Sequence, residues 1–268
     1  MPTRGGPLRT LRLFWVFFRV GAMNELQYRA NFIVQIFQSA IALGTGLAVL
    51  ALVFSQTGEL NGWTHAELLA VMGVHFLMGG IIGMAIQPNM ERLMDDVRRG
   101  TLDFTLTKPD DSQVLVSVRE FRIWRAVDVV IGAGVLAYAV SQLQTGITVA
   151  DPFVFALALL LGALMIYCFW LILTTGAFWV VRMDQIAELF EGVYQSGRWP
   201  VTIYPGWLAI SLTYLVPVAF AVTVPAEALT GRLTVETLAL AAGFAIALLA
   251  FTRWFWRFGL KHYSGASA

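Results

Sequence analysis

The chain has 268 residues, of which 58% are apolar and only 13% are charged. Soluble proteins carry about 25% charged residues, so about half of the usual solvating charge is missing. A formal net charge of +1 gives no electrostatic footprint for nucleic acid, and a single cysteine, Cys168, excludes a disulfide scaffold. These numbers predict an all-α integral membrane protein that crosses the bilayer several times.

Five stretches are apolar over a length that suits a bilayer, whose core takes about 20 helical residues. In chain order they are Asn31–Phe54, Ala66–Gln87, Ala126–Gln142, Pro152–Val181 and Glu236–Trp256. A shorter apolar stretch, Trp207–Val224, precedes the last of them.

Basic residues indicate the orientation, because short loops rich in arginine and lysine stay in the cytoplasm. Five arginines precede the first span, seven basic residues lie in the connection 88–125, and three lie near the C-terminus. The connection Ser55–His65 contains none. We therefore expect both termini to be cytoplasmic, which requires an even number of spans and makes six the expected count.

The segment 8–29 is amphipathic. Arg9, Arg12 and Arg19 fall on one stripe of a helix, and Trp15 lies among the apolar side chains of another face. This pattern is typical of a helix that lies in the membrane interface. An extension of the first span is the alternative, which the polar residues at the end of the segment disfavour.

Catalytic and nucleotide-binding motifs are absent: the sequence has no G-x-x-x-x-G-K-[ST], G-x-S-x-G or H-E-x-x-H. We therefore expect no enzyme activity and no bound cofactor or metal in this chain. His75 is a candidate intramembrane proton carrier, although a structural hydrogen bond is the more frequent role. Asp128 is expected to pair with Arg125, and Gly79 and Gly83 form a G-x-x-x-G that suits a helix contact.

The connection between the second and third spans has signals of its own. Asn89 is expected to cap a short amphipathic helix, Glu91–Arg99, that ends at Gly100. Leu93 and Val97 are four residues apart and would present one face to a soluble partner. A merely solvated loop is the alternative.

Four segments are distinctive in combination: Asn24–Phe32, Arg98–Phe104, Tyr204–Trp207 and Val216–Phe220. Together they resemble bacterial ABC transporter permeases of the type 2 (export) class, and most closely the ABC-2 family transporter permeases that often occur as pairs. The resemblance covers about residues 8–262. It implies a protein of the bacterial inner membrane, with six spans and an interfacial N-terminal helix.

The resemblance also implies partners. It implies two cytoplasmic ATPase subunits, which bind ATP and Mg, and a second permease that is identical or paralogous. A coupling helix between spans two and three would insert into the ATPase. We therefore expect one transmembrane domain, 1–268, with its coupling region at 88–125 and these coupling residues: Asn89, Glu91, Arg92, Leu93, Asp96, Val97, Arg98, Arg99, Thr101 and Asp103.

In the family, span five is followed by a re-entrant segment on the outer side. The resemblance then implies span five at 184–199 and a re-entrant piece before span six, whereas hydropathy alone favours span five at 207–224. Asp184, Glu188 and Glu191 would share one helix face. That face lines the transport pathway, or it is solvated on the cytoplasmic side.

These expectations favour the permease subunit of an ATP-driven exporter. Apolar spans with few fixed charges suit an amphipathic or lipophilic substrate, such as a drug-like compound, a lipid or a glycolipid. The alternative is an ion-coupled secondary transporter or a channel that works without an ATPase. An intramembrane enzyme is disfavoured because no pair of nucleophile and base is evident.

Overall fold

The computed structural model describes residues 29–143, 149–179 and 185–263, together with 15, 16, 19 and 23. Every named element within these residues is a helix, and the only strand-like feature among them is one isolated bridge between Leu60 and Trp63. Five helices are long and apolar enough to cross a membrane, and one bent pair of helices would add a sixth crossing if it is a broken span. The predicted all-α membrane fold is confirmed.

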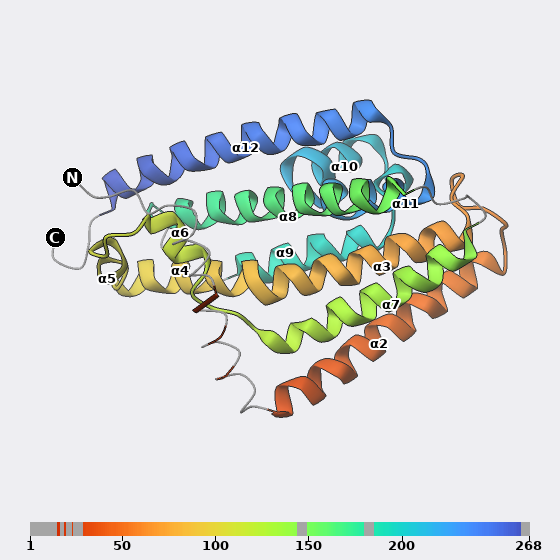
Figure 1. The fold of residues 1–268 in the computed structure, drawn as a ribbon, viewed down its shortest axis with the longest axis horizontal. Coiled ribbons are helices and arrows are strands. Elements are labelled where there is room, and N and C mark those ends of the chain that lie inside the picture. Colours follow the sequence, from red (N-terminus) through yellow and green to blue (C-terminus); the bar gives the residue numbers. More distant parts are fainter. Residues whose placement is uncertain are drawn as a thin grey trace.

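The long helices run along the long axis of the molecule (Figure 1). They are α2 (Arg29–Phe54), α3 (His65–Ile81), α7 (Ala126–Gln142), α8 (Asp151–Gly176) and α12 (Val235–His262). Their bounds lie close to those expected from hydropathy, except that α3 and α8 end before the expected Gln87 and Val181, and α12 continues to His262.

The shorter helices gather at the two ends of this bundle. At one end lie α4 (Gln87–Arg99), α5 (Asp103–Leu106), α6 (Ser112–Ser117) and η2 (Ile123–Arg125). Toward the other end lie α9 (Ile186–Gln195), η3 (Ser196–Arg198), η4 (Val201–Ile203), α10 (Gly206–Ile210), η5 (Ser211–Leu215), η6 (Ala219–Thr223) and α11 (Val224–Thr230).

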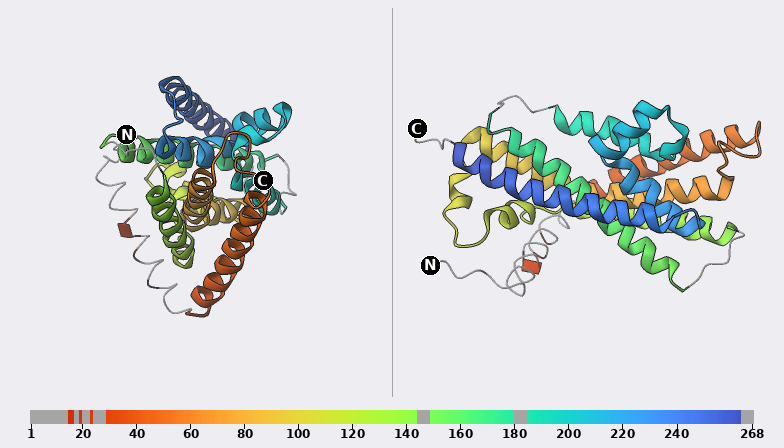
Figure 2. Two further views of the ribbon diagram at one scale, coloured as in Figure 1. Left: turned by 90° about the vertical axis from the view of Figure 1, so that its right-hand side faces the viewer. Right: turned by 90° about the horizontal axis from the view of Figure 1, so that it is seen from above.

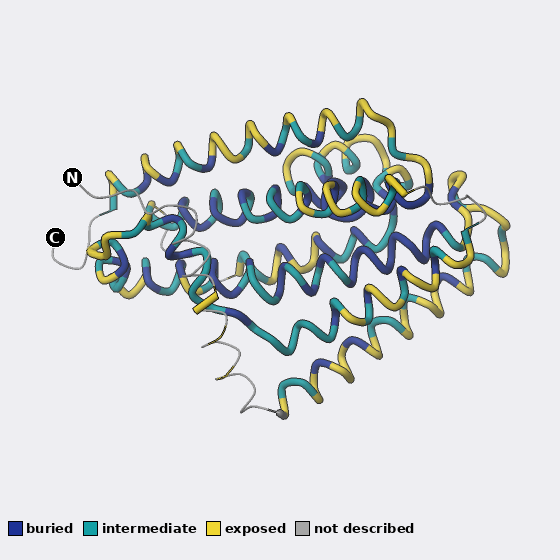
Figure 3. The backbone as a smooth tube through the Cα atoms, viewed as in Figure 1, coloured by how far each residue is buried: buried dark blue, intermediate teal, exposed yellow. Residues whose placement is uncertain are grey.

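The core lies around α3, most of whose residues are buried, whereas α2 is largely exposed along its length (Figure 3). Viewed along the long axis, α2 stands at one corner of the molecule and α12 at another (Figure 2). Exposed Ile, Val, Phe and Leu side chains cover α2, as expected of a helix that faces lipid or another chain.

Glycines bring α3 and α7 into close contact. A Cβ added at Gly132 would clash with the backbone nitrogen of Leu77, and one at Gly73 would lie 2.8 Å from the nitrogen of Leu136. Gly79 and Gly83 instead meet side chains, so the predicted G-x-x-x-G is not the closest helix contact. The closest backbone approach needs glycine on both helices, a pairing that one span's sequence does not show.

The second span does not end where hydropathy predicts. His65–Arg99 is one continuous helical run that passes through a π-helical turn, η1 (Ile82–Ile86), into α4. Pro88 has no N–H for the carbonyl of Met84, and that carbonyl accepts a hydrogen bond from the N–H of Arg122 at 3.0 Å. The expected separate helix with Asn89 as its N-cap is therefore wrong.

The chain between α9 and α12 folds back on itself. Gly206–Leu215 and Ala219–Thr230 are two arms bent by 78°, and both lie toward the end of the bundle where α8 and α12 begin (Figure 1). Pro217 lies in the break. A continuous span over 207–224 is therefore wrong, and α9 is the part of this region that runs along the bundle.

A polar cluster closes the end of the molecule opposite α5. The guanidinium of Arg232 pairs with Glu67 at 2.7 Å and lies 4.7 Å from the ring centroid of Trp63. The indole N–H of Trp63 donates to the Thr202 hydroxyl at 3.0 Å. These contacts join the α2–α3 connection, η4 and the α11–α12 corner.

Candidate functional site

Three short helices, α4, α5 and α6, form a compact unit at one end of the bundle, which we call the α4–α6 module (residues 87–122) (Figure 1). The chain reverses at Gly100, whose φ of 68° lies in the left-handed region that favours glycine. The N–H of Thr101 then donates to the carbonyl of Asp96 at 2.9 Å. The predicted stop at Gly100 is confirmed.

Asn89 holds this module together from within. Its side chain is fully buried and donates to the carbonyls of Ala85 and Glu120 at 2.7 and 2.8 Å. Its Oδ1 accepts from the N–H groups of Arg119 and Glu120 at 2.8 and 2.9 Å. Four hydrogen bonds from one amide thus fix the start of α4 to the segment that leads into α7.

A second buried contact lies about two turns further along α4. Asp96 pairs with Arg119 at 2.8 Å and accepts from the hydroxyl of Thr101 at 3.1 Å. Arg119 also donates to the hydroxyl of Thr105 in α5 at 3.1 Å. Asp96, expected to touch an ATPase, therefore serves the internal structure of the module.

Leu93 and Val97 do not form a free face. Leu93 is fully buried in the hydrophobic core, and Val97 is partly buried against it. α4 continues α3 through the π-helical turn η1, and its apolar side packs into the same hydrophobic core as α3. The prediction that Leu93 meets a soluble partner is therefore wrong, and for Val97 it stays a prediction.

The outer surface of the module carries the remaining predicted coupling residues. Arg92, Arg98 and Arg99 are exposed, and Glu91, Thr101 and Asp103 are partly exposed. Phe104 in α5 is a large apolar side chain that is 74% exposed. It ends the Arg98–Phe104 motif but is not among the predicted coupling residues, although an apolar residue beside a run of polar ones was the available signal.

The module is attached to two long helices. The guanidinium of Arg253 in α12 binds the carboxylate of Asp111, which caps α6, and donates to Gln113 at 2.7 Å. Gln113 in turn donates to the hydroxyl of Tyr167 in α8 at 3.2 Å. The hydrogen bond from Arg253 holds the pKa of Asp111 below its usual value.

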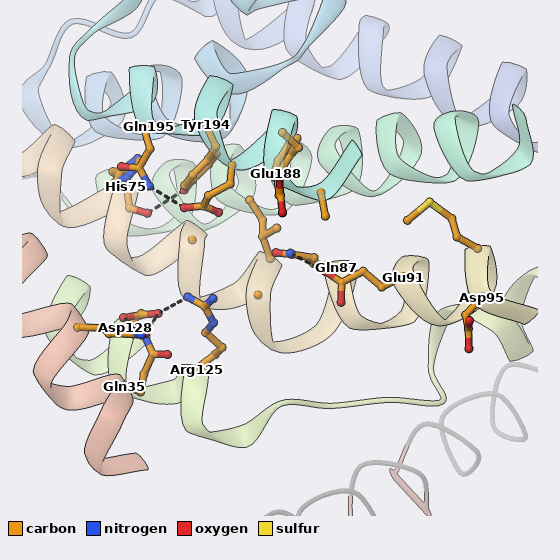
Figure 4. A pocket seen from close by; sticks show the side chains of 18 of the residues that line it. Gln35, His75, Gln87, Glu91, Asp95, Arg125, Asp128, Glu188, Tyr194 and Gln195 are labelled. Carbon is orange, nitrogen blue, oxygen red and sulfur yellow. Dashed lines mark hydrogen bonds and ion pairs between the residues drawn. The ribbon is translucent and has the colours of Figure 1, made fainter. Parts of the chain in front are cut away.

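A cavity of about 970 Å³ lies between α2, the α3–α4 run and α9 (Figure 4). Its side toward α7 contains Asp128, which pairs with Arg125 at 3.3 Å, as predicted. Asp128 also accepts from Gln35 at 3.0 Å and from the hydroxyl of Ser39. Gln35 and Ser39 are not among the predicted site residues, although two polar residues four apart in an apolar span were a visible signal.

The α9 side of the cavity contains the predicted acidic face in part. Glu188 and Glu191 are exposed and line the cavity, whereas Asp184 lies outside the described residues. Tyr194, one turn further on, donates to the carbonyl of His75 at 2.8 Å and stacks on its ring at 4.6 Å. The helix thus presents two carboxylates and one aromatic platform to the cavity.

The predicted interfacial helix lies mostly outside the described residues. Trp15 and Arg19 are helical and exposed, and Arg9 and Arg12 are not described. Its position relative to a membrane stays a prediction. In the described part of the chain, no three His, Cys, Asp or Glu side chains gather in a way that would hold a metal ion.

Comparison with known proteins gives the family. A family model described as "ABC-2 family transporter protein" matches residues 40–267, which is most of the chain. No curated protein and no solved structure gives a match. The matched region contains the α4–α6 module, α9 and the bent pair of helices, and all but the start of α2. The chain belongs to the ABC-2 family of transporter proteins.

Proposed function

We propose that this chain is the permease subunit of an ATP-driven exporter that moves an amphipathic or lipophilic substrate out of the cytoplasm or the inner leaflet. Membership of the ABC-2 family supports a permease component of an ABC transporter. The main structural support is that the α4–α6 module is continuous with α3 and is hydrogen-bonded to α8 and α12. A force on the module is therefore passed to three long helices at once.

We place the contact with the ATPase at the outer surface of the module. Phe104 projects from α5, and Thr107, Lys108 and Pro109 beside it are exposed. Aromatic side chains that insert into a partner's pocket contribute much of the affinity of protein interfaces. The exposed arginines of α4, Arg98 and Arg99, supply charge around this projection.

The mechanism follows from rigid-body coupling. Two ATPase subunits bind ATP and Mg and close on each other, which draws together the modules of this permease and of a second, identical or paralogous one. This closure would switch the interface between the two permeases from one packed arrangement to another, while each helix stays rigid. The cavity between α2, α3–α4 and α9 then forms part of the pathway, with Glu188 and Glu191 in its wall.

The orientation follows from the basic residues. We infer a bacterial inner-membrane location with both termini and the module in the cytoplasm, since the module contains most of the loop arginines. Single cysteines at Ser55–Gly62 and at Ser264 test this with a membrane-impermeant thiol reagent. Labelling of the two positions from opposite sides is expected, and labelling from the same side would exclude this topology.

The ATPase contact is tested with two matched truncations in the assembled transporter. Phe104→Ala removes an aromatic ring that is 74% exposed on the module, and Phe153→Ala removes one that is 73% exposed on α8. We expect Phe104→Ala to lower ATPase binding about 10-fold or more, as at interface hot spots, and Phe153→Ala to leave it unchanged. Equal effects from both would place the contact elsewhere.

Copurification of an untagged ATPase with the tagged permease tests the function as a whole. Transport that stops when the ATPase is made unable to hydrolyse ATP supports an exporter driven by ATP. Transport that continues without the ATPase would support the ion-coupled carrier or channel instead.

A further inference from the structure

The cavity between α2, α3–α4 and α9 has two kinds of carboxylate in its wall. Most have a cationic partner at close range: Glu91 pairs with Arg122 at 2.5 Å, Asp95 with Arg98 at 2.9 Å, and Asp128 with Arg125 at 3.3 Å. Glu188 and Glu191 have no cationic partner among the residues that the structure describes. Glu191 accepts a hydrogen bond from the uncharged side chain of Gln195 at 2.6 Å.

The charges along the cavity are separated. Glu188 lies in the first turn of α9. The α4 carboxylates that line the cavity, Glu91 and Asp95, belong to the module, as does Arg98, which lines the cavity as well (Figure 4). Arg198 follows the other end of α9, and no carboxylate of the described chain forms an ion pair with it. Because each α4 carboxylate has an arginine partner, the negative charge without an ion pair lies on α9, at Glu188 and Glu191.

Aromatic rings form part of the wall. Phe76, Phe178 and Phe190 line the cavity together with Tyr194 and His75. His75 is 5% exposed, and its Nδ1 has no hydrogen-bond partner among the described residues. A buried ring nitrogen without a partner is costly, and it marks a polar position among the aromatic residues of this wall.

We propose that this cavity binds organic cations that have an aromatic or other apolar body, and that such cations are the substrate class of the exporter. The proposal rests on the proposed function. Carboxylates and the faces of aromatic rings both attract a cation, and the attraction grows where water is excluded. Glu188 and Glu191 would then be neutralised by the substrate that the cavity takes up.

Other substrate charges fit this wall less well. An anion would meet Glu188 and Glu191, and Arg125 and Arg98 already have carboxylate partners. Arg198 is the remaining cation in the wall, and it lies beyond the end of α9 opposite Glu188. A neutral substrate would displace water from both carboxylates and leave them without a counter-charge, which is unfavourable in a low-dielectric site. A cation beside Glu188 and Glu191 therefore improves the electrostatics of this part of the cavity on binding.

The test uses two probes of the same shape and opposite charge, tetraphenylphosphonium and tetraphenylborate. Binding of each is measured on the assembled transporter in nanodiscs of zwitterionic lipid, so that lipid charge does not contribute. We expect tetraphenylphosphonium to bind about tenfold or more tightly than tetraphenylborate. This comparison needs no variant and is therefore independent of any folding defect.

The second part of the test uses the double variant Glu188→Gln with Glu191→Gln. It keeps the size of both side chains, and residue 191 can still accept the hydrogen bond from Gln195. We expect tetraphenylphosphonium affinity to fall about tenfold while tetraphenylborate affinity stays the same or rises. Glu236→Gln, in the first turn of α12 away from the cavity, is the matched control and should change neither.

Two results would overturn the proposal: equal affinity of the wild type for both probes, or unchanged tetraphenylphosphonium affinity in the double variant. Either result with an intact, ATPase-bound permease removes the substrate class and leaves the exporter function standing. Loss of ATPase copurification in the wild type would instead remove the exporter function, which is a separate outcome.

Discussion

Arg253 in α12 holds the carboxylate of Asp111 with two nitrogens of its guanidinium, while Asp111 caps the N-terminus of α6 and accepts from the N–H of Gln113 at 3.0 Å. One carboxylate thus caps the first turn of a helix in the module and also binds a helix of the membrane bundle. This contact gives the module a fixed position on α12.

The Asp111 contact predicts a pH-dependent stability. Its pKa is lowered in the folded protein, chiefly by the hydrogen bond from Arg253, so the contact stabilises the fold above the unfolded-state pKa of about 3.9. This contribution is lost as the pH falls through the folded-state pKa. Asp111→Asn keeps a capping side chain but loses the charge, so we expect it to unfold at a lower temperature than the wild type at pH 7.

Thermal unfolding of the purified permease from pH 7 downward is the measurement. The difference between wild type and Asp111→Asn should vanish at the acid end. Asp111→Ala loses the cap as well and should be less stable than Asp111→Asn by about 1 kcal/mol throughout. A wild-type advantage over Asp111→Asn that does not change with pH would contradict the role of the charge.

The buried hydrogen bonds of Asn89 predict a large loss of stability when this residue is replaced. Asn89→Ala leaves two backbone N–H groups and two carbonyls without its hydrogen bonds, each costing about 1–3 kcal/mol when buried. We expect a destabilisation of about 3 kcal/mol or more in denaturant unfolding. Arg92→Ala, on the exposed side of the same helix, should cost less than about 1 kcal/mol. Similar losses for both variants would show that the network contributes little.

The close approach of α3 and α7 predicts opposite effects at two glycines of the same helix. An added Cβ at Gly132 clashes with the backbone of Leu77, whereas one at Gly134 meets nothing within 4 Å. We expect Gly132→Ala to cost about 1–3 kcal/mol through forced separation of the helices. Gly134→Ala should be neutral or slightly stabilising, because alanine favours a helix over glycine. Thermal unfolding of both variants checks this, and equal behaviour would exclude the close contact.

Because Leu93 is buried and Phe104 is exposed, we expect Leu93 to affect folding and Phe104 to affect coupling. Leu93 is fully buried, so Leu93→Ala should destabilise the permease by about 2–5 kcal/mol. Phe104→Ala should leave its unfolding temperature unchanged and reduce the stimulation of ATP hydrolysis by the permease. Measuring unfolding and ATPase activity on the same preparations separates the two. Normal stability of Leu93→Ala would restore Leu93 as a surface residue.

The membrane character, the positions of five long helices and the stop at Gly100 follow from the sequence by itself. They depend on local properties: about 20 consecutive apolar residues make a span, and a glycine after charged helical residues ends a helix. Family membership was likewise accessible, because motifs such as Arg98–Phe104 are contiguous in the chain. None of these conclusions needs to know which residues are neighbours in space.

The tertiary structure decided the rest. Asn89 is a residue type that often caps helices, but its side chain bonds to the backbone of residues 119 and 120, about thirty positions away. Leu93 has the pattern of a free apolar face, but the π-helical turn and the carbonyl of Met84 let α3 continue past Pro88 and turn that face into the core. Gln35 binds Asp128 across 93 positions of sequence. Hydrogen bonds and packing between distant segments set these roles, and a pattern read along one helix contains no information about the surface that the rest of the chain places against it.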